Sequence, residues 1–282
     1  TWAEAAALGS LPQGARLSVL HGVGPDDCEA ALAIEARPVL NTAAQVARWK
    51  AIAPGRACDL MVATGMNRLG LRMEDVQLAE GLKIDTLMSH LACGDEDSAM
   101  NGVQLERFRA VADVVPARRR SLANSAGICL GPEFGFDLVR PGLALYGGVP
   151  RREAEGHIAQ VAFPEAEVVQ RRVVKAGETI GYGATWTAAR DTEAAILNIG
   201  YADGYLRCFA GVGAASFAGA RLPLIGRVSM DLVAVDCSDA AGLAEGDWVM
   251  LDYALPEAAA ATGLSQYELL TGLSQRLERI WS

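Results

Sequence analysis

The sequence predicts an α/β protein in which an incomplete (β/α)8-type barrel, residues 1–152, is followed by a β-strand-rich domain, residues 153–282. Two observations predict this arrangement. Short apolar segments alternate with amphipathic segments up to about residue 150, which indicates parallel strands joined by right-handed crossovers. Beyond that point, runs rich in Val, Ile and Ala are separated by glycine-containing turns, which is typical of an all-β domain.

We expect six buried strands in the first domain, with helices between them. The strands are 17–20, 38–40, 60–64, 84–90, 120–123 and 144–146. The helical segments are 43–52, 73–82 and 104–114. A complete barrel has eight strands, so a shortfall of two agrees with a missing N-terminal portion. An open, doubly wound sheet is the alternative, although no glycine-rich dinucleotide fingerprint follows the first strand.

The second domain contains four apolar runs with strand character and a closing helix. The runs are 161–180, 194–199, 222–237 and 248–253. Ser265 and Glu268 have the spacing of a capping box, which predicts a helix from Ser265 to about Arg279.

Composition excludes several classes of function. A hydrophobic content of 51% with 21% charged residues describes a soluble protein with a large core. The net charge of −9 argues against a nucleic-acid binder, and no apolar run approaches the roughly 18–20 residues of a membrane span. The six cysteines have no zinc-site spacing, so we expect no metal and a reducing, cytoplasmic location.

Polar residues follow several predicted strands of the barrel, where side chains face the active site of such folds. Arg68 ends the segment Thr64–Arg68, and its planar guanidinium suits a carboxylate or phosphate, although a surface arginine is the simpler interpretation. Asn124 and Ser125 begin a helix, as an N-cap or as a phosphate cradle. Arg140 lies in an apolar strand and must find a partner there.

The second domain carries three glycine-containing blocks, which are 180–186 (IGYGATW), 199–205 (IGYADGY) and 226–231 (GRVSMD). Glycine permits positive φ and close approach of two backbones, so a tyrosine beside it is held in a defined direction. A packed turn aromatic is the simpler interpretation of Tyr182 alone.

Taken together, these motifs resemble those of the alanine racemases, enzymes that invert alanine on pyridoxal phosphate (PLP). The resemblance covers nearly all 282 residues. It implies that Arg140 donates to the ring nitrogen of PLP, so that the nitrogen stays unprotonated and the cofactor is a weaker electron sink. It also implies that His90 supports this arginine. In this resemblance the PLP phosphate is bound by Ser125 with Asn124 and by the amides of Gly142 and Leu143.

The resemblance further implies roles in substrate binding and proton transfer. Arg68 contacts the substrate carboxylate or the phenolic oxygen of the cofactor. Tyr182 is one of two bases and belongs to the partner subunit of a head-to-tail homodimer. Tyr201 shapes the substrate entrance, and Met230 with Asp231 lines the partner's active site near the carboxylate.

Three departures from the family pattern bear on function. The lysine motif of the family would precede residue 1, and none of Lys50, Lys83 and Lys175 resembles it. Met61 occupies a position where several racemases carry a carbamylated lysine, and an anion such as chloride is a candidate substitute. Gln275 stands where a phosphate-binding tyrosine is often found.

These departures leave alternatives open. We expect an active alanine racemase whose N-terminal segment is missing from this chain. A racemase with broader specificity, for serine or basic amino acids, is one alternative. A truncated, non-catalytic relative that binds PLP or only dimerises is the other.

Overall fold

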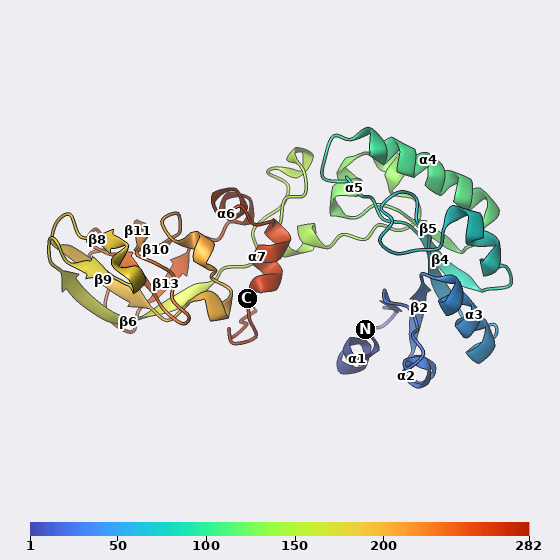
Figure 1. The fold of residues 1–282 in the computed structure, drawn as a ribbon, viewed down its shortest axis with the longest axis horizontal. Helices are drawn as coiled ribbons and strands as arrows, with labels where there is room; N and C mark the ends of the chain where they lie inside the picture. Colours follow the sequence, from blue (N-terminus) through green and yellow to red (C-terminus); the bar gives the residue numbers. More distant parts are fainter. Residues whose placement is uncertain (282) are drawn as a thin grey trace. The chain divides into compact units, whose positions relative to one another are not determined.

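The computed structural model describes residues 1–281, which form two compact units. Unit 1 is Thr1–Gly142 and unit 2 is Leu143–Ser282. Figure 1 shows unit 1 in blue and green and unit 2 in yellow to red. Among the described residues, no helix combines the length and the apolar character that crossing a membrane requires.

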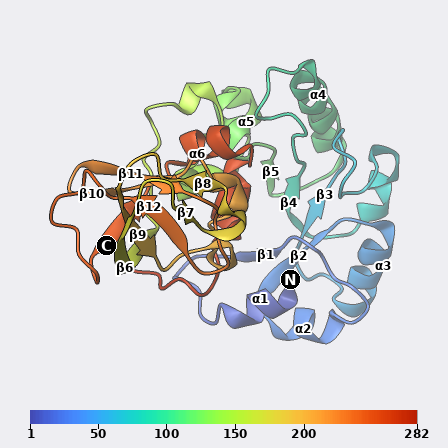
Figure 2. The ribbon, with the colours of Figure 1, turned by 60° about the vertical axis from the view of Figure 1, so that its left-hand side comes forward.

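Unit 1 is built around a parallel sheet of five strands in the order β1-β2-β3-β4-β5. The strands are β1 (Leu17–Val19), β2 (Ala36–Leu40), β3 (Cys58–Met61), β4 (Ile84–Met88) and β5 (Arg119–Ser121). The helical segments are α1 (Trp2–Ala7), α2 (Cys28–Ala33), α3 (Ala43–Ile52), the 3-10 helix η1 (Met73–Ala79), α4 (Ala99–Val114), α5 (Ser125–Cys129) and the 3-10 helix η2 (Pro132–Phe134). Figure 2 shows α2, α3 and α4 along one side of the sheet.

This strand order distinguishes the two predicted folds. A doubly wound sheet reverses its order at a switch point, whereas consecutive strands in sequential order, with helices on one side, form an arc of a barrel. The two faces of the sheet also differ. Leu60 and Leu87 pack under the helices, together with Trp49 and Phe108. On the other face, Val39, Met61 and Met88 form a separate apolar layer.

Helix ends in unit 1 follow local sequence chemistry. Thr42 caps α3, since its side-chain oxygen accepts from the amide of Gln45, and Ser98 caps α4 in the same way. The predicted helix 104–114 is the C-terminal part of α4. The segment 73–82 is not an α-helix but the 3-10 helix η1, which ends at Ala79.

The predicted strand 144–146 is wrong, because residues Leu143–Tyr146 form the 3-10 helix η3. The segment begins directly after Pro141 and Gly142. It closes on itself, since the amide of Gly148 donates to the carbonyl of Leu143 at 3.1 Å. An apolar run of three residues does not distinguish a strand from a buried helical turn.

Unit 2 contains a closed β-barrel in the order β10-β11-β12-β9-β6-β13 and a separate hairpin of β7 with β8. Its strands are β6 (Glu165–Val174), β7 (Thr179–Ile180), β8 (Trp186–Thr187), β9 (Thr192–Leu197), β10 (Ala214–Phe217), β11 (Ala220–Ile225), β12 (Val233–Asp236) and β13 (Trp248–Leu251). Its other helical segments are η4 (Arg152–Ala154), η5 (Tyr182–Ala184), η6 (Tyr201–Asp203), η7 (Arg207–Phe209), α6 (Leu255–Thr262) and α7 (Gln266–Gly272). The core of unit 2 includes Leu222, Val235 and Leu251, together with Tyr205 and Tyr253.

The predicted closing helix begins where expected but is much shorter. Ser265 caps α7 in a capping box with Glu268. The helix ends at Gly272 rather than near Arg279, because Leu273 is extended and the amide of Ser274 donates to the carbonyl of Asp203. A tertiary contact therefore replaces the helical hydrogen bonds beyond Gly272.

Candidate active site

In unit 1, the predicted site residues follow the carboxyl ends of neighbouring strands. Arg68 lies in the loop after β3, His90 follows β4, and Asn124 with Ser125 follows β5. Because the carboxyl ends of parallel strands share one edge of a sheet, the topology brings these loops together.

Arg140 is tied to the ends of β4 and β5. Its guanidinium donates to the carbonyl oxygens of Ser89, Ser121 and Leu122, and to the hydroxyl of Ser121. Its own backbone amide donates to the carbonyl of Ala123 at 2.9 Å. Burial lowers the pKa of Arg140 to about 10, so the side chain remains a cation at neutral pH. The guanidinium is fixed at the carboxyl edge of the sheet.

His90 lies within the field of both candidate arginines. Burial, and then the charges of Arg140 and Arg68, lower the pKa of His90 to about 4. Its imidazole is therefore neutral at physiological pH and can accept a hydrogen bond from a guanidinium. That His90 supports Arg140 stays a prediction.

Ser125 and Gly142 are in direct contact. The Ser125 hydroxyl accepts from the amide of Gly142 at 2.9 Å. The side-chain oxygen of Asn124 accepts from the amide of Gly127, which makes Asn124 the N-cap of α5. The backbones of Asn124 and Arg140 also form an isolated parallel β-bridge. The loop after β5 thus places a hydroxyl and a helix start beside the segment that carries Arg140.

Leu143, the remaining predicted phosphate contact, belongs to unit 2. Its amide donates to the hydroxyl of Tyr267 at 2.9 Å. The backbone donor that the resemblance assigns to the phosphate is therefore paired with a phenol from α7.

Met61 does not have a polar environment. It is 8% exposed and packs with Val39 and Met88 in the apolar layer of the sheet. None of the three lysines belongs to this cluster of candidate residues. Lys50 lies in α3, Lys83 is exposed just before β4, and Lys175 pairs with Asp191 in unit 2.

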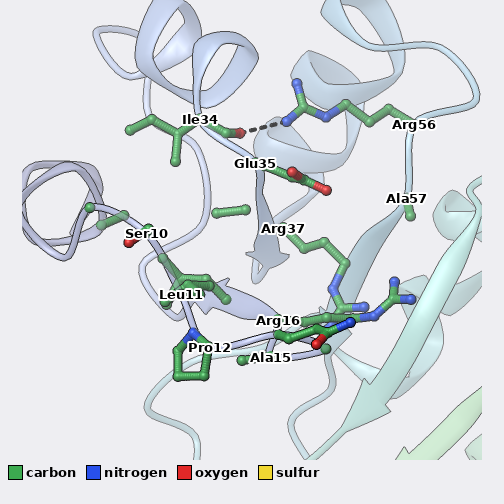
Figure 3. A pocket seen from close by; sticks show the side chains of 16 residues that line it. Ser10, Leu11, Pro12, Ala15, Arg16, Ile34, Glu35, Arg37, Arg56 and Ala57 are labelled. Carbon is green, nitrogen blue, oxygen red and sulfur yellow. Dashed lines mark hydrogen bonds between the residues drawn. The ribbon is translucent and has the colours of Figure 1, made fainter.

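A cavity of about 630 Å³ lies elsewhere in unit 1. Figure 3 shows Arg16, Glu35, Arg37 and Arg56 around it, with Arg56 bonded to the carbonyl of Ile34. Its lining residues precede β1, β2 and β3 or lie at their amino ends. The cavity is therefore at the opposite edge of the sheet from the candidate residues, and we assign it no part in the site.

Tyr182 lies on a sharp turn of unit 2 and is 72% exposed. Gly181 and Gly183 flank it with φ of 76° and 73°, values that glycine adopts without strain. A Cβ at Gly183 would lie 3.4 Å from the guanidinium of Arg227, so the turn rests against that arginine. The glycines thus hold a turn on which the side chain of Tyr182 is exposed to solvent.

Tyr201, Met230 and Asp231 come together in unit 2. The amide of Tyr201 donates to the carbonyl of Ser229 at 3.0 Å, and the amide of Ala202 to that of Met230 at 2.9 Å. The side chains of Met230 and Asp231 are both about half exposed. These three residues therefore form one group in unit 2, and among the described residues no hydrogen bond joins Tyr182 or Leu143 to it.

Family models match the two parts of the chain in succession. The model described as alanine racemase, N-terminal domain, matches residues 1–150, and the model described as alanine racemase, C-terminal domain, matches residues 161–281. The chain belongs to the alanine racemase family.

Curated proteins of this family match most of this chain and most of their own length. An alanine racemase from Acidiphilium cryptum is 40% identical over 98% of this chain and 82% of its own length. A catabolic alanine racemase from Agrobacterium fabrum is 40% identical over 95% of this chain and 74% of its own length.

Solved structures of alanine racemases share the fold. The alanine racemase of Bartonella henselae, with covalently bound pyridoxal phosphate, superimposes with a TM-score of 0.90 at 33% identity, covering 99% of this chain and 83% of that one. The biosynthetic alanine racemase of Pseudomonas aeruginosa gives a TM-score of 0.86 at 34% identity, with the same coverage. The predicted barrel with a β-rich second domain is confirmed.

Three residues with a part in the geometry are missing from the sequence predictions. Gln104 is fully buried on α4 and bonds the hydroxyl of Thr64, the carbonyl of His90 and the amide of Ala92. Tyr267 meets Leu143. Arg276 bonds Asp231. Of these three residues, only Gln104 carries a signal in the sequence, because it is an uncharged polar residue at a core position of a helix.

Proposed function

We propose that the protein interconverts L-alanine and D-alanine with pyridoxal phosphate. The observation that carries this proposal is the position of Arg140, a guanidinium fixed by carbonyls of β4, β5 and their loops beside a neutral His90. Family membership supports the same reaction.

The residues of unit 1 fit the cofactor. Arg140 would donate to the ring nitrogen, and Ser125, whose hydroxyl accepts from the amide of Gly142, would hold the phosphate, because a hydroxyl at the start of a helix favours an anion. When bound, pyridoxal phosphate withdraws electrons from the α-carbon of the substrate. An arginine keeps its proton at neutral pH, so it leaves the ring nitrogen unprotonated and limits this withdrawal.

Tyr267 supports the phosphate end of the proposal. The resemblance implies a phosphate-binding tyrosine near the C-terminus, and Gln275 does not supply one. The hydroxyl of Tyr267 lies 2.9 Å from the amide of Leu143, which is itself a predicted phosphate contact. We therefore assign the tyrosine role to Tyr267.

Inversion at the α-carbon needs a base on each face of the substrate. We assign Tyr182 to one face, since its phenol is exposed on a turn that two glycines hold in place. The resemblance implies a cofactor lysine as the other base. Lys50, Lys83 and Lys175 all lie away from the unit 1 cluster, so none of them takes this role.

The substrate is held by its carboxylate. Arg68 follows β3, and its charge lowers the pKa of His90; we assign its planar guanidinium to that carboxylate. In the arrangement we propose, Tyr182, Tyr201, Met230 and Asp231 complete the site of a second copy in a head-to-tail homodimer. We place the enzyme in the cytoplasm, whose reducing conditions suit a chain in which no disulfide joins any of the six cysteines.

The test is racemisation by the holoenzyme with each enantiomer separately. We expect L-alanine to yield D-alanine, and the reverse, with loss of activity when pyridoxal phosphate is removed and recovery when it is restored. Chiral chromatography measures both directions. L-serine serves as the comparison, and faster turnover of serine would assign a different substrate. A protein that retains the cofactor and converts neither enantiomer would contradict the proposal.

A further inference from the structure

Arg276 joins two acidic residues of unit 2 at the place where the substrate-facing turns meet. Its Nη2 donates to Oδ1 of Asp231 at 2.8 Å, and its Nε lies 3.3 Å from Oδ1 of Asp203. The Asp203 side chain is 7% exposed, whereas that of Asp231 is 53% exposed. The guanidinium of Arg276 therefore forms ion pairs with one buried carboxylate and one exposed carboxylate.

The backbone around Arg276 is held in place independently of this ion pair. The amide of Ser274 donates to the carbonyl of Asp203 at 3.0 Å. A Cβ at Gly204 would lie 2.4 Å from the carbonyl oxygen of Gly272, so the two segments touch through their backbones. Arg276 is therefore presented to the acidic pair by a chain segment that stays in position when its side chain changes.

Asp203 links this arrangement to Tyr201. Its carboxylate accepts from the amide of Gly200 at 2.9 Å, which closes the turn η6 that carries Tyr201. Two amides of η6 also donate to the carbonyls of Ser229 and Met230. Arg276 thus contacts, through Asp203 and Asp231, both segments that the proposed function places at the substrate.

We propose that Arg276 is a positioning residue that neutralises Asp231, so that the Met230–Asp231 turn can lie beside the carboxylate of an amino-acid substrate. The inference rests on the proposed function. An unpaired carboxylate on that turn would repel an anionic substrate group, whereas a paired one leaves the neighbouring backbone and Met230 free to approach it. The charges of Asp231 and Asp203 also raise the pKa of Arg276, as expected for a cation in an acidic environment.

The experiment uses four variants of the holoenzyme. R276Q removes the charge, R276K retains it, and R276Q/D231N removes the pair together. R221Q is the matched control, because Arg221 pairs with Asp252 on the same unit at similar exposure. The measurements are the inhibition constant of propionate, which is alanine without its amino group, KM and kcat for each enantiomer, and the melting temperature.

We expect R276Q to raise the inhibition constant of propionate and the KM for alanine roughly fivefold, the size of one partly exposed charge interaction. R276K should stay near wild type, and R276Q/D231N should recover most of the loss. R221Q should change none of these constants. A purely structural arginine would lower the melting temperature without this charge-dependent pattern.

Two results would overturn the inference. One is an R276Q holoenzyme with unchanged propionate inhibition and KM. The other is a double variant no better than R276Q, which would mean that the uncompensated charge of Asp231 is not the cause. Failure of the wild-type holoenzyme to racemise alanine would instead overturn the proposed function, so the two failures are distinguishable.

Discussion

Burial and the neighbouring guanidinium of Arg140 together hold the pKa of His90 at about 4, well below its ordinary value of 6.5. The folded protein therefore keeps the imidazole neutral between these two values, whereas the unfolded chain protonates it. Because the unfolded state binds more protons in this window, His90 makes stability fall as the pH is lowered from 6.5 towards 4. NMR titration of the ring protons should give a midpoint near 4.

The variant H90Q provides the control for this titration. It removes the resonance that we assign to His90 and should flatten the dependence of stability on pH between about 4 and 6.5. A midpoint near 6.5 in the wild-type protein would mean that the imidazole is solvated and not held beside Arg140.

Replacing Arg140 tests the link between the sheet edge and cofactor binding. R140A leaves carbonyls at the ends of β4 and β5 without a donor, and we expect a loss of about 2 kcal/mol in the free energy of unfolding. R140K keeps the charge but not the planar fork, so it should lose less stability. Both should weaken binding of pyridoxal phosphate roughly tenfold or more, which fluorescence titration measures. Unchanged affinity in R140A would remove Arg140 from the cofactor site.

Y182F tests the two-base assignment. We expect wild-type stability, because the phenol is 72% exposed. Proton exchange at the α-carbon should slow by roughly 100-fold for one enantiomer and much less for the other, since only one face loses its base. Exchange is measured in D2O with each enantiomer separately. Y146F, at another exposed tyrosine of unit 2, is the control, and equal, unaltered rates for both enantiomers in Y182F would contradict the assignment.

The sequence predicted local order better than tertiary contacts. Strand–helix alternation predicted the parallel sheet, and the motifs placed Arg68 in a turn after one strand and His90 at the end of the next, because both depend on local pattern. The run 144–146 and the end of α7 were mispredicted, since a turn at Gly148 and the carbonyl of Asp203 decide them. The contacts of Tyr267 and Arg276 lie across the fold, and no spacing along the chain reveals such partners.

Ser125 and Tyr267 test the phosphate end of the site. S125A removes the hydroxyl that accepts a hydrogen bond from the amide of Gly142. Y267F removes the hydroxyl that accepts a hydrogen bond from the amide of Leu143. Each variant should weaken the binding of pyridoxal phosphate roughly tenfold, which is the size of a hydrogen bond to a charged group. The binding of pyridoxal, which lacks the phosphate, should stay unchanged. Calorimetry with both ligands measures this. S98A, which alters the cap of α4, is the control. Equal losses for the two ligands would place these hydroxyls away from the phosphate.

Asp85 in β4 is a buried carboxylate whose ion pairs provide a test of stability against pH. It is 7% exposed and pairs with Arg37, Arg118 and Arg119. Burial raises the pKa of Asp85, but the hydrogen bond from Arg119 and the arginine charges outweigh it, and the net pKa is lowered below 3.8. The stabilising contribution is therefore complete above pH 3.8 and is lost as the pH falls through the folded pKa.

D85N should accordingly lower the free energy of unfolding at pH 7 by about 3 kcal/mol, because Arg119 loses its buried counter-charge and Arg37 keeps only Asp59. The difference between D85N and wild type should shrink below pH 3.8, because the unfolded wild-type chain binds a proton at Asp85 before the folded protein does. Urea unfolding at pH 7, 5 and 3 measures it. D191N, at the exposed pair with Lys175, is the control and should change stability little at any pH. A D85N penalty that stays constant down to pH 3 would show that the side chain acts through packing, since only the charge of the carboxylate titrates in this range.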